Sequence, residues 1–405
     1  MHSNDRNHND SLEESFFRSM TSFQDSFVGA EPTTGTPEED GSSSLSFRRT
    51  DDLDESLANS FGPDAADSVC IPPLTRKELK VGEFVGQGSF SRVFAVDSIQ
   101  LNEDDDTDDL SLSELCTEEE LRARQDLSKQ FGRGRKFVVK YIKRKLLRKP
   151  KEFKQAVLDM EKEAKILSLL DNDYIVQLRG IAKGGTAALS SGRFDDFFLI
   201  MDRLDTTLDQ RIGQWKEQDV VVSDPQRIQS VLTFGHQLAL ALNHLHSHRL
   251  IFRDLKPNNV GLLKCAVTGT EKVQLFDFGL CRALPLSSSS GSDDQDECFH
   301  LSMAGTMRYM APEVMDYEPE YNTKADVYSW AVTLYEMLAL RKPYGEIIRH
   351  TQFQEIICGL GKRPFLGDLN LPAAIQELLN DSWCASISQR LTMQKVLDRL
   401  ARIQQ

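Results

Sequence analysis

The stretch Phe252-Arg253-Asp254-Leu255-Lys256-Pro257-Asn258-Asn259 places a carboxylate, an ammonium group and a side-chain amide within eight consecutive residues. A second carboxylate, in the triplet Asp277-Phe278-Gly279, follows a short hairpin's length downstream. A carboxylate can act as a base, an ammonium group can neutralise phosphate charge, and amide and carboxylate oxygens are ligands for Mg²⁺. We expect one cleft to hold all four groups.

The composition is that of a protein with room for a two-lobed domain and a tail, since 40% of its 405 residues are hydrophobic and 27% are charged. Its seven cysteines form no Cys-x-x-Cys pair, which indicates reduced thiols in the cytoplasm or the nucleus. No apolar run approaches the roughly 18 residues of a membrane span. We expect neither a membrane nor a nucleic acid among its partners.

The net charge of −14 is unevenly distributed along the chain. Residues 1–70 hold 15 acidic and 4 basic side chains, and residues 101–120 hold 10 acidic and no basic ones. The rest of the chain is therefore basic, as a site for phosphate chemistry requires. The acidity lies in segments outside the expected catalytic core.

Residues 1–74 show no sustained helical or strand period and are rich in Ser, Asp, Glu, Thr and Gly, so we predict a disordered tail. Three segments in it share the pattern Ser, apolar, two residues, Ser, Phe: residues 11–16, 22–27 and 56–61. They are either docking or phosphorylation motifs for partners of the tail, or chance similarities in a biased sequence.

From residue 79, short β-branched and aromatic runs broken by glycine predict strands, the third of them at Phe137-Val138-Val139. An insertion at 101–135 separates the second strand from the third. It begins with the acidic run 103–109, and capping-box spacing of Thr117 and Glu120 predicts a helix after it. We interpret the insertion as a solvated excursion.

Helical periodicity dominates the rest of the chain. Residues 152–170 form one predicted helix, and the clearest later ones are 226–248 and 326–338. A small strand-rich lobe followed by a larger, mainly helical lobe is an α+β architecture.

The segment Gly86-Gln87-Gly88-Ser89-Phe90-Ser91-Arg92-Val93 joins the first two strands. Two glycines let backbone N–H groups approach a triphosphate without an intervening Cβ, and Val93 offers an apolar surface to a base. An ordinary hairpin turn would explain the same residues.

Taken together, the stretch 252–259 and the triplet 277–279 resemble the catalytic loop and the magnesium-binding turn of the protein kinase superfamily, serine/threonine type. The resemblance implies a bilobal fold over 79–403: an N-lobe at 79–201 with a five-stranded antiparallel sheet and one helix, a hinge at 202–204, and a C-lobe at 205–403 with an enlarged activation loop at 277–313. It implies ATP and Mg²⁺ as cofactors.

In that resemblance Asp254 is the general base, Lys256 neutralises the transferred phosphoryl group, and Asn259 and Asp277 bind metal. Phe252 departs from the family's usual His or Tyr, and we expect its ring to pack beneath Phe278 without the histidine's hydrogen bonds. The altered packing should change the stability of the active arrangement more than the chemistry.

The resemblance also assigns the nucleotide contacts. Lys140 would bind phosphate and pair with Glu163 on the following helix, with Glu161 as a second candidate. The hinge would face adenine, with Met201 as gatekeeper. The cofactor-binding set is Val85, Gly86, Gln87, Gly88, Val93, Lys140, Met201, Asp202, Leu204, Asn259 and Asp277. Ser91 stands where the family has a third glycine.

Further matches concern the substrate and regulation. Gly305 to Glu313 resembles the segment that seats the acceptor residue, Glu313 would pair with Arg390, and Asp326 would anchor the catalytic loop. The stretch 326–332 is similar to the tyrosine-kinase-like group of serine/threonine kinases. We hypothesise that phosphorylated Ser302 pairs with Arg253. Flexible serines at 287–290 and 292 are the alternative.

The resemblance implies transfer of the γ-phosphoryl group of Mg-ATP to protein Ser/Thr hydroxyls in intracellular signalling. A pseudokinase scaffold that binds nucleotide and partners is the alternative. Against it, Lys140, Glu163, Asp254, Asn259 and Asp277 are all present. A small-molecule kinase of similar fold is disfavoured by the segment around Thr306.

Overall fold

The computed structural model describes residues 57, 61, 70–101, 117–191, 193–218, 224–265, 267–285, 297–347 and 349–404. The chain divides into two units, 1–48 and 49–405, and every element below belongs to the second. The acidic run 103–109, the loop serines 287–290 and 292, and the motif copies at 11–16 and 22–27 lie outside the described residues.

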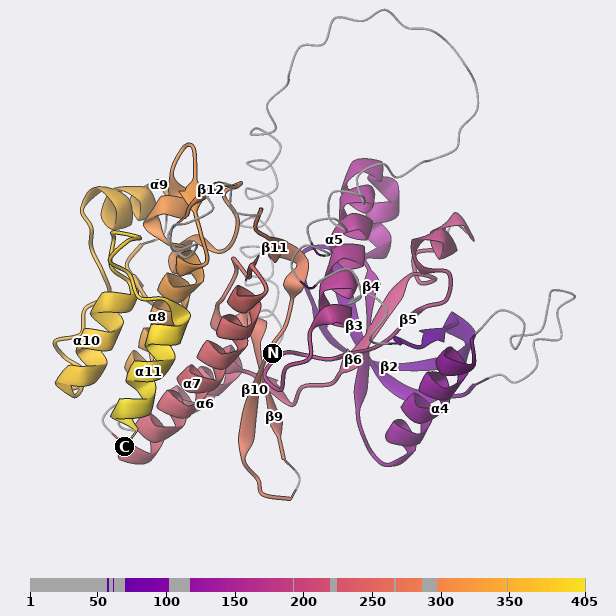
Figure 1. The fold of residues 1–405 in the computed structure, drawn as a ribbon. Helices are drawn as coiled ribbons and strands as arrows, with labels where there is room; N and C mark the ends of the chain where they lie inside the picture. Colours follow the sequence, from indigo (N-terminus) through magenta and orange to yellow (C-terminus); the bar gives the residue numbers. More distant parts are fainter. Residues whose placement is uncertain are drawn as a thin grey trace, which may run out of the picture. The chain divides into compact units, whose positions relative to one another are not determined.

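One lobe is built on a six-stranded sheet with the strand order β1-β5-β6-β4-β3-β2 (Figure 1). Its strands are β1 (Pro73–Leu74), β2 (Leu79–Gln87), β3 (Ser91–Ile99), β4 (Phe137–Ile142), β5 (Leu178–Ala182) and β6 (Phe198–Asp202). The five predicted antiparallel strands are β2 to β6, and β1 adds a sixth that runs parallel to β5. The tail boundary at residue 74 is therefore wrong, because its last two residues are a strand.

The centre of this sheet follows from uninterrupted apolar runs. All residues of β4 and of β6 are buried, as in strands that are covered on both faces. Helix α5 (Pro150–Leu169) lies against β4 and β5 and buries its apolar stripe, including Val157, Met160 and Leu167. The helix predicted over 152–170 is confirmed.

The helix predicted inside the insertion is α4 (Glu118–Gly132), which begins with a capping box between Thr117 and Glu120. It is part of the lobe and not a solvated excursion. Arg124 is 3% exposed and donates to the carboxylate of Glu78 and to the carbonyl oxygen of Pro73. The lobe thus has two long helices where the resemblance implied one, and a buried ion pair between Arg124 and Glu78 joins the second of them to the rest of the lobe.

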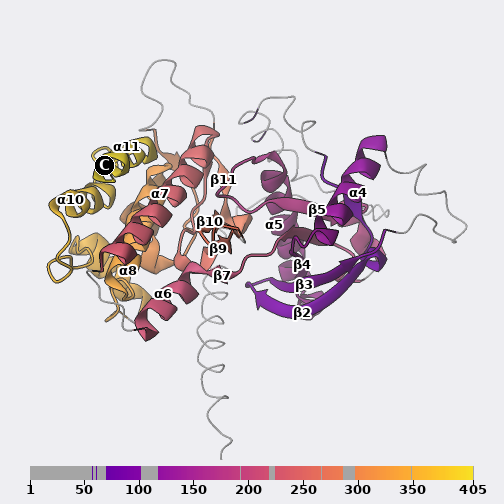
Figure 2. The same cartoon turned by 90° about the horizontal axis from the view of Figure 1, so that it is seen from below.

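The second lobe is mainly helical. Its helices are α6 (Leu208–Glu217), α7 (Pro225–Ser247), α8 (Lys324–Ala339), α9 (His350–Phe353), α10 (Ala373–Ser382) and α11 (Met393–Ile403), with a π-helical segment at Gln354–Gly359. Figure 2 shows α7 alongside α8 and α11, and it packs against both. Every residue of α8 is buried, including the charged Lys324, Asp326 and Glu336, so this helix lies in the core of the lobe. The predicted helices 226–248 and 326–338 are confirmed.

Short strands connect these helices and carry the polar loops. They are β7 (Thr206–Thr207), β8 (Leu250–Ile251), β9 (Val260–Lys264), β10 (Glu271–Leu275), β11 (Arg282–Ala283), β12 (Phe299–His300) and β13 (Glu320–Tyr321). The pairing of Val260 with Leu275 brings Asn259 and Phe276 to one end of the β9–β10 hairpin, where the N–H of Phe276 donates to the carbonyl of Asn259 at 3.0 Å. Asn259 and Asp277, the residue after Phe276, therefore lie close together at this end of the hairpin.

Across the part of the chain that the structure describes, no helix combines the length and the apolar character that a membrane span requires.

Candidate active site

The carboxylate of Asp254 lies at the centre of a polar cluster. It accepts hydrogen bonds from Lys256 Nζ at 2.7 Å, Asn259 Nδ2 at 2.9 Å and Thr306 Oγ1 at 2.7 Å. Lys256 also donates to Thr306 at 2.8 Å. A hydroxyl group therefore sits against the predicted base, with an ammonium group beside both.

Gly305 allows this approach. Its φ of +113° is rare for any other residue, and a Cβ there would lie 2.3 Å from the carbonyl oxygen of Arg253. Only glycine brings the backbone of the activation segment close enough for Thr306 to reach Asp254.

The catalytic loop is anchored from below by Asp326, the buried carboxylate in the first turn of α8. Its oxygens accept from the backbone N–H groups of Phe252 and Arg253, each at 2.9 Å, and contact His246 Nε2 at 2.9 Å. Arg253 has a φ of +71°, a strained conformation for a residue with a Cβ. The predicted anchoring role of Asp326 is confirmed, and it holds the strained residue in place.

Lys140 and Glu163 form a buried ion pair with 2.5 Å between Nζ and Oε2. Asp277 Oδ1 lies 3.7 Å from the same ammonium group. Burial lowers the pKa of Lys140, but the carboxylates of Glu163 and Asp277 outweigh it and leave the pKa raised, so Lys140 is charged. Glu163, not Glu161, is the partner, as the sequence predicted first.

The triplet at 277–279 is shaped around a buried aromatic pair. The Phe278 ring packs edge-on against Phe252 with centroids 5.2 Å apart, and both rings are fully buried. The expected packing of Phe252 beneath Phe278 is confirmed. Asp277 has a left-handed backbone, with φ +67°, and its side chain stays 46% exposed.

Asn259 and Asp277 offer oxygen ligands of the kind Mg²⁺ prefers. The Nδ2 of Asn259 donates to the carbonyl and the carboxylate of Asp254, each at 2.9 Å, which turns its Oδ1 the other way. Among the described residues, no group donates a hydrogen bond to the Oδ1 of Asn259. The two side chains fit a divalent cation, and their metal role stays a prediction.

Apart from Asn259 and Asp277, the predicted nucleotide-binding residues belong to the six-stranded sheet, to the β2–β3 turn and to the hinge. Gly86 and Gly88 flank the β2–β3 turn, and a Cβ on Gly86 would meet nothing within 4 Å, so space exists above the backbone. Val85 is 44% exposed beside them. Within the described part of the chain, the backbone groups of Leu204 have no hydrogen-bond partner. They are free for adenine, and the contact of the hinge with the base stays a prediction.

Asp202 carries a feature that the sequence did not reveal. Its buried carboxylate accepts paired hydrogen bonds from Arg135 at 2.9 and 2.9 Å and from Arg179 at 3.1 and 2.8 Å. A buried carboxylate needs cationic partners, which is a readable signal, but the partners are 67 and 23 residues away. The end of the insertion is thereby fastened to the hinge.

The segment predicted to seat the substrate is fixed to the second lobe. Glu313 receives two hydrogen bonds from the buried Arg390, at 2.5 and 2.9 Å, so the predicted pair is confirmed. Ser329 of α8 donates to the carbonyl of Tyr309 at 2.8 Å in the same segment.

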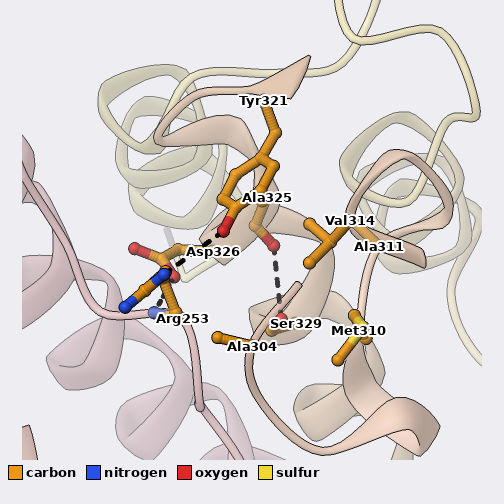
Figure 3. Close-up of a pocket in the computed structure, with 9 residues that line it drawn as sticks. All are labelled: Arg253, Ala304, Met310, Ala311, Val314, Tyr321, Ala325, Asp326 and Ser329. Atoms are coloured by element: carbon orange, nitrogen blue, oxygen red, sulfur yellow. Dashed lines mark hydrogen bonds between the residues drawn. The ribbon is translucent and has the colours of Figure 1, made fainter. Parts of the chain in front are cut away.

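Figure 3 shows Arg253 and Tyr321 pointing toward each other at a small cavity of about 10 Å³. That volume is the lower limit for one water molecule, so the cavity is not a ligand site. Nη1 of Arg253 lies 3.5 Å from the hydroxyl of Ser302 and 3.5 Å from that of Tyr321. The predicted phosphorylation site therefore faces the predicted cation.

Two further cations, Lys162 and Arg282, lie near Arg253. Burial, together with the charges of Arg253 and Arg282, lowers the pKa of Lys162 on α5 to about 8. Burial and the charge of Arg253 likewise lower the pKa of Arg282. Among the described residues none of the three forms an ion pair with a carboxylate. Sequence reasoning named only Arg253, because the other two converge on it only in the fold.

Comparison with known proteins agrees with this geometry. Residues 127–400 match the family described as "Protein kinase domain". The chain is 32% identical over 168 residues to the putative ribosomal protein S6 kinase alpha-2 of Caenorhabditis elegans, covering 40% of this chain and 21% of the relative. It is 29% identical over 178 residues to the serine/threonine-protein kinase VIK of Arabidopsis thaliana, covering 44% and 38%.

A third relative is the mitogen-activated protein kinase kinase kinase 13-A of Xenopus laevis, 30% identical over 176 residues, which are 42% of this chain and 16% of the relative. The chain therefore spans well under half the length of the relatives it matches.

Proposed function

Since the chain belongs to the protein kinase family, we propose that it is a serine/threonine protein kinase that transfers the γ-phosphoryl group of Mg-ATP to hydroxyls of protein substrates. The observation that carries the proposal is that the carboxylates of Glu163 and Asp277 both lie within 4 Å of the Lys140 ammonium group, while a second polar cluster surrounds Asp254.

Asp254 accepts the proton of the incoming hydroxyl. Its carboxylate already holds the Thr306 hydroxyl at 2.7 Å, which is the distance a substrate hydroxyl needs for general-base catalysis. Lys256 Nζ, 2.7 Å from the same carboxylate, stabilises the negative charge that develops on the transferred group.

Lys140 holds the ATP phosphates, and its ion pair with Glu163 keeps the ammonium group in position and charged. Asn259 and Asp277 would hold the magnesium ion, which when bound would neutralise charge on the phosphates. The glycine turn covers the phosphates, and the hinge at Leu204 binds the base.

A pseudokinase scaffold is the competing function. In an assay with purified protein, Mg-ATP and a generic Ser/Thr substrate, Asp254→Asn should lower the rate by about 10² to 10⁴ while nucleotide binding persists. Asp126→Asn, on the exposed face of α4, is the control and should act as wild type. Nucleotide binding by the wild type with no transfer above the Asp254→Asn level would establish the scaffold instead.

We also propose an intracellular role in signalling through protein substrates. The support is indirect: the relatives' printed names include a mitogen-activated protein kinase kinase kinase, and the six described cysteines are all free thiols. A substrate search with the active chain and its Asp254→Asn variant would identify the proteins phosphorylated. Phosphorylation of a small molecule but of no protein would contradict this role.

A further inference from the structure

Two residues of the tail are packed into the folded chain, and one of them contacts the second lobe. Leu57 is only 4% exposed and belongs to the hydrophobic core, although it precedes β1 by 16 positions. Phe61 stacks on the imidazole of His248, with ring centroids 4.4 Å apart and an interplanar angle of 18°. Neither contact is expected of a residue in a solvated tail.

Contacts with His244 fix the orientation of the His248 ring that stacks on Phe61. It caps the C-terminal end of α7, and its Nδ1 lies 2.9 Å from the carbonyl oxygen of His244. The two imidazoles also pack edge to face, with centroids 4.7 Å apart. The ring of His248 therefore presents one fixed face, against which an aromatic side chain packs without first ordering its partner.

The spacing of the contact residues explains the repeated pattern in the tail. Leu57 and Phe61 both have helical backbone, and they are four positions apart, the spacing at which side chains share one face of a helix. The other two copies repeat the spacing, with Leu12 before Phe16 and Phe23 before Phe27. The element common to all three is an apolar residue with a phenylalanine four positions later.

We propose that the surface around His244 and His248, at the end of α7, is a docking site for a helical turn with this apolar-x-x-x-Phe face. We assign its occupant as the segment that carries Leu57 and Phe61. Of the three copies this one is tethered by the shortest stretch to β1, which gives it the highest effective concentration at the site.

The docking site lies next to the catalytic loop in the chain but includes none of the predicted catalytic residues. Arg249, the next residue after His248, has a φ of +54°, and its carbonyl accepts from the N–H of Leu284 at 2.8 Å. Directly after it, β8 pairs with β11 of the activation segment. An occupant of the site therefore contacts the residue that precedes the backbone leading from α7 into the catalytic loop.

Hydrogen exchange on the full chain tests the contact. The double variant Leu57→Ser/Phe61→Ser should raise the exchange rate of amides in residues 244–251 by about tenfold. The matched control Leu12→Ser/Phe16→Ser should leave them unchanged. Unchanged exchange in the first variant, or an increase only in the second, overturns the assignment of the occupant.

A binding measurement tests the surface itself. A fluorescent peptide of residues 53–65 should bind the Leu57→Ser/Phe61→Ser chain, and bind wild type at least about tenfold more weakly, because the site is filled in cis. Adding His248→Ala to the variant should weaken binding about fivefold or more, whereas His236→Ala on the same helix should not. Equal binding to wild type and variant, or no binding, overturns the proposal.

Both measurements omit nucleotide and substrate. They can therefore fail while phosphoryl transfer succeeds, and they can succeed in a chain that transfers no phosphate.

Discussion

Phosphorylation of Ser302 should order the activation segment through Arg253 and the two cations, Lys162 and Arg282, that lie near Arg253. The hydroxyl is exposed and already lies 3.5 Å from Nη1 of Arg253. The charges of Arg253 and Arg282 are close enough to Lys162 to lower the pKa of its ammonium group. A phosphate on Ser302 would bring about two negative charges and three acceptor oxygens into this cationic cluster.

The magnitude follows from the number of new bonds. Hydrogen bonds to charged groups contribute about 1.5–3 kcal/mol each, so two of them give about 3–6 kcal/mol before ordering and desolvation are subtracted. A net coupling of about 1–3 kcal/mol is typical for such switches, which corresponds to a shift of roughly 5- to 150-fold toward the ordered state. We expect kcat/KM to rise within that range.

The assay compares the chain carrying phosphoserine at position 302 with Ser302→Ala. Protein-kinase rate, exchange protection of residues 297–305 and the Lys162 pKa, measured by NMR, should all change together. The pKa of Lys162 should rise from about 8, because the phosphate offsets the charges of Arg253 and Arg282. Ser292→Ala is the control. Equal activity, protection and Lys162 pKa in the two chains would refute the reasoning.

Three further outcomes are expected. Burial and neighbouring cations lower the pKa of Lys162 from 10.5 to about 8, so between pH 8 and pH 10.5 the unfolded chain binds more protons than the folded chain. The free energy of unfolding should therefore rise with pH across this range by up to about 3 kcal/mol more in wild type than in Lys162→Met, as measured by urea titration. Arg124→Ala should destabilise the fold by about 3–5 kcal/mol in urea, since it removes the cation that balances the buried Glu78 carboxylate, whereas the exposed Arg122→Ala should change it by less than about 0.5 kcal/mol; equal effects would show that the buried pair is not what holds α4. Asp202→Ala leaves two arginines without their carboxylate and should weaken ATP binding at the hinge more than it lowers kcat, a split that steady-state kinetics detects; an unchanged KM for ATP would contradict it.

The features that could be predicted are those that depend on residues close together in the sequence. The helices α5, α7 and α8 follow from apolar periodicity, and α4 was visible in the capping box at Thr117. The catalytic loop follows from motif spacing, because its residues act together within one short segment. Local chemistry was enough to place each of these on an element.

The features that could not be predicted depend on partners far apart in the chain. Arg124 meets Glu78 across 46 residues and the carbonyl of Pro73 across 51, so neither α4 packing nor β1 has a local signal. The acidic composition at the start of the insertion favoured a solvated segment, and the buried cation that overrides it looks, in the sequence, like any surface arginine. Periodicity predicts a helix but not the surface against which it packs.

Phe252 shows how a departure from a motif can be absorbed by the fold. The loss of a histidine there removes side-chain hydrogen bonds, yet the anchor of the loop uses the backbone N–H of residue 252, which every side chain but proline retains. A histidine does contact the anchoring carboxylate, but it is His246, at the end of α7. The ring of Phe252 is then free to serve packing alone, edge-on to Phe278 and fully buried. Polarity that the family usually places in the loop is supplied here by the helix before it, and a change at His246 should therefore disturb the loop more than restoring histidine at position 252 would strengthen it.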